Sequence, residues 1–151
     1  MSSQPDRPRR LEGEERQAVR AYLQRHTSGV LSTIGDDGRP QSAFVDLAVT
    51  PDLEIVFETL ASSRKFHNIE RDRHVALVIG WDGNKTAQIE GVADEVPESR
   101  RDDLLALYRA ACPRNARHEG WPGLTYVRVR PRWIRVSDYG WPWHVDEFTL
   151  V

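Results

Sequence analysis

The stretch LEIVFETLASSRKFHNIERDRHVALVIGW, residues 53–81, sets two apolar runs on either side of a polar segment. The runs at 53–58 and 74–81 are rich in β-branched and aromatic residues, which is typical of strands. Between them, Ser62 or Ser63 is placed to cap a short helix whose first turn carries an Arg-Lys pair. This part of the chain therefore predicts a strand, a helix and a second strand in direct succession.

The first turn of this helix gathers groups that bind phosphate. Hydroxyl groups, the cationic side chains of Arg64 and Lys65 and unpaired helix amides come together at one point. Two cations at this position are opposed by the positive end of the helix dipole, and a bound anion would remove that conflict. Two interpretations stay open from these residues alone: an ordinary cap with solvated charges, and an anion site.

The rest of the chain continues the strand pattern. Further strands are predicted at 29–34, 41–49, 86–96 and 124–136. The last is expected to be interrupted at Pro131, and the turn residues GDDG at 35–38 predict a hairpin. Amphipathic helices are predicted after Leu11 and at 99–111. Many antiparallel strands with few helices predict a mainly β fold, a closed or partly closed β-barrel with peripheral helices.

Length and composition limit the function classes. The 151 residues match one domain, predicted at 11–151 after a flexible tail at 1–10. The net charge of −2 gives no attraction toward nucleic acid or an anionic membrane, so neither is an expected partner. There is no apolar run of signal-peptide or membrane-spanning length, and the single cysteine, Cys112, is expected to be a packed thiol. The chain is therefore predicted to be cytoplasmic.

The runs FETLASSRKFHNIE and QIEGVADEV, residues 57–70 and 88–96, resemble the pyridoxamine 5′-phosphate oxidase-related family of flavin-binding split barrels. The resemblance extends over residues 29–96. It implies an antiparallel, Greek-key-like split β-barrel that forms a homodimer with its cofactor at the interface. It also implies which residues hold flavin mononucleotide (FMN). The phosphate would be bound by Thr59, Ser63, Arg64 and Lys65, and the ring or ribityl chain by Thr86 and Gln88.

The chain departs from the named oxidase at two places. That enzyme has an Arg and a Lys on the strand at 41–48, where this chain has Ala43 and Ala48. Its basic substrate-binding pattern is also missing from WIRVSDYGWPWHVDEF, residues 133–148. The expected function is therefore an FMN-dependent oxidoreductase that moves hydride or electrons to or from another small organic substrate. The alternatives are a non-enzymatic flavin or haem carrier and a deazaflavin-dependent reductase on the same fold.

Other side chains give further candidates, although none is predicted to be catalytic because the cofactor would carry the chemistry. One aromatic cluster fits stacking on a ring system, a plug of the barrel or a dimer contact: Tyr139, Trp141, Trp143 and His144. The five histidines lack the spacing of metal ligands, so no metal site is predicted, and His144 is the candidate for a single haem ligand. One basic strand face is expected to be a solvated exterior, formed by Arg128, Arg130 and Arg132.

Overall fold

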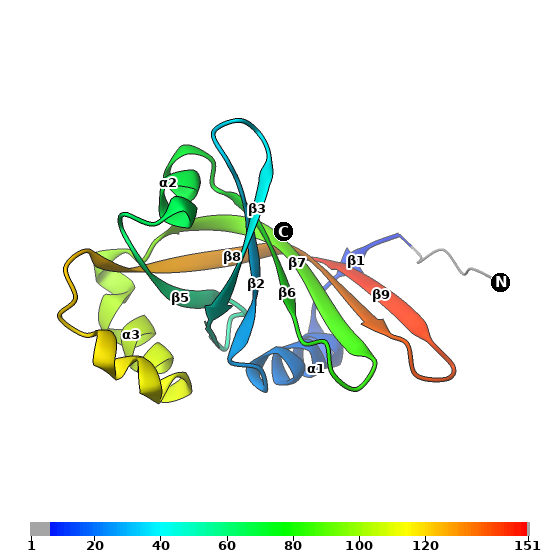
Figure 1. The fold of residues 1–151 in the computed structure, drawn as a ribbon. Helices are drawn as coiled ribbons and strands as arrows, with labels where there is room; N and C mark the ends of the chain where they lie inside the picture. Colours follow the sequence, from blue (N-terminus) through cyan, green and yellow to red (C-terminus); the bar gives the residue numbers. More distant parts are fainter. Residues whose placement is uncertain (1–6, 151) are drawn as a thin grey trace.

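The computed structural model describes residues 7–150, which form one nine-stranded sheet curled into a split barrel with helices around it (Figure 1). In chain order the elements are β1 (Arg9–Arg10), α1 (Gly13–Gln24), β2 (Ser28–Ile34), β3 (Pro40–Asp46), β4 (Ala48–Val49), β5 (Ile55–Leu60), α2 (Arg64–Arg71), β6 (His74–Ile79), β7 (Lys85–Glu95), the 3₁₀ helix η1 (Glu98–Arg100), α3 (Arg101–Ala111), the 3₁₀ helix η2 (Pro113–His118), β8 (Leu124–Asp138) and β9 (His144–Thr149). The predicted mainly β fold with peripheral helices is confirmed.

The long strand β8 is the centre of the sheet. It pairs with β7, β9 and β5, and the main path runs β1-β9-β8-β7-β6-β2-β3. The other edge of β5 pairs with β4 through Ile55 and Val56. Within residues 7–150, β3 pairs with β2 alone, and β5 beyond Val56 has no partner opposite β8. The barrel is therefore split between β3 and β5.

The hairpin between β2 and β3 forms at the predicted turn. The N–H of Gly35 donates to the carbonyl of Arg39 at 2.8 Å, and Gly38 has a φ of 80°. A positive φ of this kind favours glycine, which explains the residue at that position. The ladder then runs from Ile34 opposite Pro40 down to Ser28 opposite Asp46.

Several strand predictions need correction. The strand predicted at 41–49 is divided into β3 and β4, and β9 is a strand that the sequence did not predict. The interruption at Pro131 is wrong, because β8 continues and Pro131 pairs with Gly91 at a bulge that accommodates a residue without an N–H. A Cβ on Gly91 would lie 2.5 Å from the Arg130 carbonyl oxygen, so this close approach requires glycine.

The start of the chain is also more structured than predicted. The flexible tail was expected at 1–10, and residues 1–6 lie outside the described part of the structure. Arg9 and Arg10 form β1, which runs parallel to β9 although every other strand pair in the described sheet is antiparallel. The guanidinium of Arg9 also bonds to Glu15 and to Asp146. The folded part of the chain therefore begins before Leu11.

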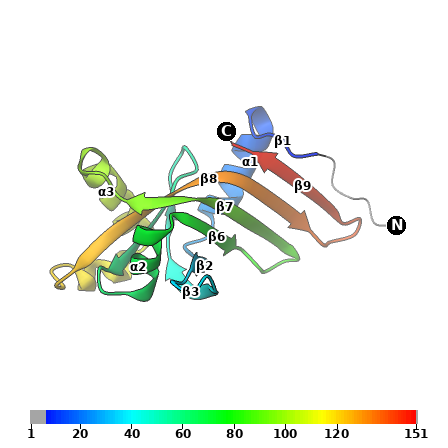
Figure 2. The ribbon, with the colours of Figure 1, turned by 90° about the horizontal axis from the view of Figure 1, so that it is seen from above.

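Each helix covers a different part of the barrel (Figures 1 and 2). The apolar face of α1 packs Val19 and Leu23 into the main core. On the outer side of β5 and β8, α3 buries Tyr108 in a second core cluster with Tyr126, and Cys112 is buried there as predicted. Helix α2 lies beside the β2–β3 hairpin, so its N-terminus is next to the split.

Arg128 is not part of a solvated exterior, which corrects the prediction for that residue. Its side chain is 12% exposed and donates to Asp94 from Nε at 3.1 Å and from Nη2 at 2.8 Å. Its Nη1 lies 3.4 Å from Glu54, to which Arg100 also donates at 3.0 Å. These pairs join β7, β8 and the residue before β5 to the 3₁₀ helix η1. Arg130 is 51% exposed, in line with the prediction.

Candidate functional site

Three of the predicted phosphate-binding residues meet where β5 ends and α2 begins. Thr59 Oγ1 and Ser63 Oγ lie 2.8 Å apart, and Ser63 Oγ accepts a hydrogen bond from the Phe66 N–H at 3.3 Å. Ser63 is thus the N-cap of α2, and no acidic residue stands in the first turn of this helix. The positive end of the helix is therefore uncompensated by a side chain and favours an anion.

Helix α2 is fixed to the barrel by its buried face. Phe66 and Ile69 belong to the main core, and Asn68 is only 5% exposed. The side-chain amide of Asn68 donates to Thr33 Oγ1 at 3.0 Å and to Gln41 Oε1 at 2.8 Å. These bonds use both amide hydrogens, so the buried donor is satisfied and the helix is tied to β2 and β3. The N-terminal turn is therefore held in one place relative to the split.

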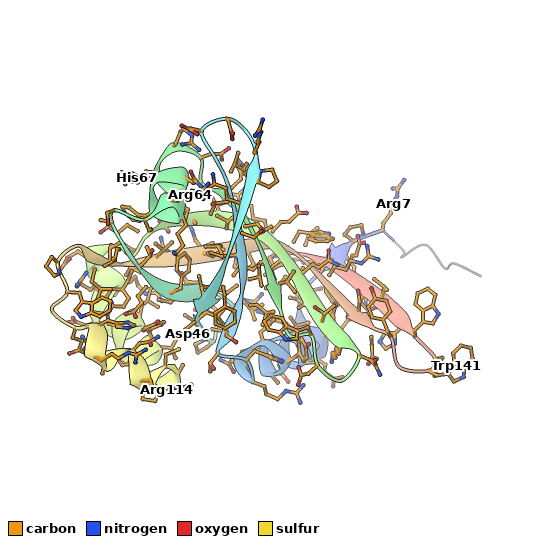
Figure 3. All side chains as sticks on the ribbon, in the orientation of Figure 1. Arg7, Asp46, Arg64, His67, Arg114 and Trp141 are labelled. Carbon is orange, nitrogen blue, oxygen red and sulfur yellow. The ribbon has the colours of Figure 1, made fainter. Side chains whose placement is uncertain are left out.

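A pocket of about 320 Å³ opens in the split between β3 and β5, and Thr59, Ser63 and Lys65 line it. A second hollow of about 250 Å³ lies between α2 and the β2–β3 hairpin, and Arg64 and Lys65 line that one. Lys65 is half-buried and borders both cavities, whereas Arg64 is exposed. Figure 3 shows Arg64 and the exposed His67 on α2. Lys65 is therefore the cation placed best for an anion in the split.

Thr86 and Gln88, the residues predicted to contact the ring or ribityl chain, lie elsewhere in the structure. They line a hollow of about 270 Å³ on the outer face of the sheet, together with Val78 and Trp133. Neither residue lines the two cavities that border Lys65. The structure thus brings Thr59, Ser63 and Lys65 together in one pocket and places Thr86 and Gln88 outside it.

The outer face of the sheet near Gln88 exposes several apolar side chains. Phe44 is 64% exposed and Val78 is 37% exposed. The strand register aligns Phe44, Val30, Val78 and Gln88 across β3, β2, β6 and β7. Cross-strand neighbours share one face of a sheet, so these side chains form a continuous patch.

The pocket in the split contains a carboxylate that sequence reasoning missed. Glu58 Oε1 is hydrogen-bonded to His118 Nδ1, and the Glu58 side chain is 9% exposed. The imidazole ring of His118 lies 4.4 Å from the indole ring of Trp121, measured between centroids. Glu58 and His118 are 60 positions apart in the chain, so no local spacing could have linked them.

A second polar group, also missed, forms the opposite wall. Asn115 Nδ2 donates to Asp46 Oδ2 at 3.0 Å and lies 2.8 Å from the Tyr108 hydroxyl oxygen. Asp46 is at the end of β3, away from the tip of the β2–β3 hairpin (Figure 3). Burial raises the pKa of Tyr108 above its usual range, so this hydroxyl stays neutral. The pocket thus has carboxylates on both β3 and β5.

The aromatic cluster predicted from the sequence lies in the loop between β8 and β9. Trp141 is 93% exposed, Tyr139 is 58% exposed and Trp143 is 40% exposed, so the cluster does not plug the barrel of its own chain. Figure 3 shows Trp141 at the tip of this hairpin, far from Arg64. His144 is also exposed, with Nε2 at 3.7 Å from Asp146, and does not line the pocket in the split.

The described residues contain neither a metal-binding cluster nor a membrane-spanning helix. Among residues 7–150 there is no group of three or more His, Cys, Asp and Glu side chains that could hold a metal ion. No helix in the same part of the chain is long and apolar enough to span a membrane.

Comparison with known proteins gives matches over most of the chain. The family model described as pyridoxamine 5′-phosphate oxidase matches residues 16–138. The pyridoxine/pyridoxamine 5′-phosphate oxidase of Haemophilus influenzae is 32% identical over 93 residues, which are 61% of this chain and 44% of that protein. The chain spans about half the length of the curated relatives it matches.

Solved structures share the fold at low identity. The heme binding protein from Mycobacterium smegmatis has a TM-score of 0.79 at 16% identity, over 92% of this chain and 59% of that one. A FAD-binding protein from Mesorhizobium loti has a TM-score of 0.64 at 14% identity, over 77% of this chain and 88% of that one. At these identities the likeness shows the fold alone. With the family model matched from residue 16 to residue 138, the split barrel built around β8 belongs to the pyridoxamine 5′-phosphate oxidase family.

Proposed function

We propose that this protein is a homodimeric oxidoreductase that binds FMN and moves hydride or electrons to or from a small organic substrate. The observation that carries the proposal is the group formed by Thr59, Ser63 and Lys65, which lies at the N-terminus of α2 and opens into the pocket in the split. Family membership supports the same assignment, because the family resemblance implies that these residues hold the FMN phosphate.

The residues present fit a phosphate monoester. Two hydroxyls 2.8 Å apart can donate to its oxygens, and the half-buried Lys65 supplies the opposite charge. Arg64 adds a second, exposed cation, and the first turn of α2 holds no carboxylate that would repel the ligand. Bound FMN would supply the redox chemistry, while the chain holds the phosphate and shields the pocket from water.

The free edge of β3 is the second part of the proposed site. Phe44, Val45 and Asp46 line the pocket, and β3 has no ladder partner on this side within the described sheet. Unpaired peptide N–H and C=O groups on such an edge can hydrogen-bond to the polar edge of a flavin ring. This contact needs no particular side chain, so Ala43 does not prevent it.

In this proposal, Thr86 and Gln88 contact the flavin only if two subunits associate through the surface near these residues. Both residues border the apolar patch around Phe44 and Val78, and an exposed patch of this kind is suited to a subunit interface. Because they line a different hollow from Lys65, their proposed contact with the flavin depends on how two subunits are arranged. The cytoplasmic location also stays a prediction.

The absorption spectrum of the purified protein tests the proposal. Added FMN should travel with the protein on a sizing column at the volume of a dimer, and a reductant should bleach its visible bands. Steady-state oxidation of a reduced nicotinamide with a panel of small acceptors should then show turnover. A protein that takes up no FMN would refute the cofactor assignment, and one that binds FMN without turnover would refute the enzyme assignment.

A carrier that binds flavin or haem without turnover is the alternative. Two observations favour it: Ala43 and Ala48 replace cationic residues of the named oxidase, and a solved structure with this fold is a heme binding protein. An intense Soret band after addition of haem would support it. The predicted haem ligand His144 lies outside the pocket. If a His144→Ala variant keeps the Soret band, the haem site would be assigned to the pocket in the split. Uptake of a deazaflavin in place of FMN would support the deazaflavin-dependent reductase.

A further inference from the structure

The pocket in the split has two chemically different ends. At one end Lys65 stands with Thr59 and Ser63, and at the other the carboxylates of Asp46 and Glu58 stand on opposite walls. Lys65 is the one lysine or arginine among its lining residues, which all lie within the described part of the chain. A phosphate held at the first end uses that cation, so a second phosphate would face carboxylates alone.

Glu58 has an unused acceptor in this pocket. Its side chain is 9% exposed, and its Oε1 is bonded to His118. Within the described residues its Oε2 has no hydrogen-bond partner, and it is not among the fully buried polar atoms, so it stays accessible from the pocket. An accessible carboxylate oxygen on a mostly buried side chain can make a charge-assisted hydrogen bond with a cationic donor.

His118 fixes the position of this carboxylate. Its Nδ1 is hydrogen-bonded to Glu58 Oε1, and its Nε2 lies 3.3 Å from Arg117 Nε. The imidazole ring packs against Trp121, and the His118 side chain is 19% exposed. The bond therefore holds Oε1 in place and leaves Oε2 free for a ligand in the pocket.

An aromatic ring stands beside these carboxylates. Trp121 lines the pocket, is 50% exposed and packs against His118. Ring faces bind flat apolar groups and attract cations. We infer that this acidic end binds the positively charged group of a planar organic substrate, such as an amine or a pyridinium, and disfavours a phosphorylated one. The inference deepens the proposed function, because it names the substrate class of the same pocket.

Three ring compounds that differ in charge test the inference. Calorimetric titration with 1-methylnicotinamide, nicotinamide and nicotinate compares a cation, a neutral molecule and an anion on one ring. The cation should bind the FMN-loaded protein about tenfold or more tightly than the neutral compound, and the anion more weakly than both. Pyridoxamine should likewise bind this protein more tightly than pyridoxamine 5′-phosphate. A nicotinate affinity equal to that of the cation, or no measurable binding of the cation, would overturn the inference.

Single-residue variants test whether the carboxylates of the pocket cause the preference for the cation. Glu58→Gln keeps the shape of the side chain and should reduce the preference for the cation to within about threefold in the FMN-loaded protein. Glu98→Gln is the matched control, because it removes one exposed carboxylate outside the pocket and should leave the preference intact. If Glu58→Gln does not fold, Asp46→Asn at an exposed position must lower the preference instead. An unchanged preference in the folded variant would overturn the inference.

The two proposals fail separately. If the protein takes up no FMN, the proposed function fails, and the same titrations on the flavin-free protein still decide whether the acidic end selects cations. If FMN binds and the charge series shows no preference, the proposed function stands and the inference about the substrate fails.

Discussion

Lys65→Met should weaken FMN binding and leave riboflavin binding almost unchanged, because the two ligands differ only in the phosphate. Lys65 is half-buried between two cavities, so its charge is partly shielded from water. A charge-assisted hydrogen bond in such a position contributes about 1.5–3 kcal/mol, which corresponds to a loss of affinity of roughly 10- to 150-fold. Methionine retains most of the apolar stem, so packing is disturbed little.

Arg64→Met is the matched comparison on the same helix turn. Arg64 is exposed, and a solvated cation at this distance contributes about 0.2–1 kcal/mol. Its effect should disappear in 1 M salt, where the Debye length is about 3 Å, while most of the Lys65 effect should persist. The structure therefore ranks the two cations, which the sequence alone does not.

Fluorescence titration measures both ligands, because flavin emission changes on binding. Dissociation constants for FMN and riboflavin would be determined for the wild type and both variants at 0.1 M and 1 M salt. Equal losses for FMN and riboflavin in Lys65→Met would refute the phosphate assignment. A larger FMN loss in Arg64→Met than in Lys65→Met would show that the phosphate lies at the hairpin side of α2 and not in the split.

Three further outcomes follow from the structure. Arg128→Met should lower the free energy of unfolding by about 3 kcal/mol, because it removes both hydrogen bonds to Asp94, whose side chain is 19% exposed. Arg130→Met should cost under about 1 kcal/mol, because Arg130 is 51% exposed. Equal losses in urea titrations would contradict this ranking. Burial raises the pKa of Cys112 from 9.0 to about 11, so its thiol should react with an aromatic disulfide at pH 8 only after unfolding. The free energy of unfolding should also fall as the pH rises from 9 to 11, because the unfolded chain loses the thiol proton first. Rapid labelling of the native protein would refute the burial of this thiol. Ser63→Asp should keep the helix cap and thermal stability yet reduce FMN affinity, whereas unchanged affinity would place the phosphate elsewhere.

The local parts of the fold were predictable because each depends on neighbours in sequence. Ser63 is a good N-cap for any helix that starts at the next residue, and its bond to the Phe66 N–H needs only local geometry. The strand β9 was missed because its sequence, HVDEFT, has no clear apolar alternation. It is held by pairing with β8 and β1, and such long-range ladders leave little trace in a single sequence.

In the candidate site, too, contacts between residues close in sequence were predictable and contacts between distant residues were not. Thr59 and Ser63 lie four positions apart, and the predicted meeting of their hydroxyls at the helix N-terminus is what the structure shows. The partners of Glu58 and Asp46 lie 60 and 69 positions away, on η2. Contacts of that range depend on how η2 folds back over the split, so the acidic end of the pocket became visible only in the structure.

The unpaired edge of β5 explains how one pocket is lined both by the phosphate-binding group and by the carboxylates. Neighbouring residues of a strand point to opposite faces, so Glu58 and Thr59 belong to different sides of β5. In a fully paired sheet they would face separate compartments. Here β5 lacks a ladder partner beyond Val56, so one cavity passes around the edge and reaches both side chains. The split therefore allows a phosphate group beside Thr59 and a cationic group beside Glu58 within one pocket of about 320 Å³.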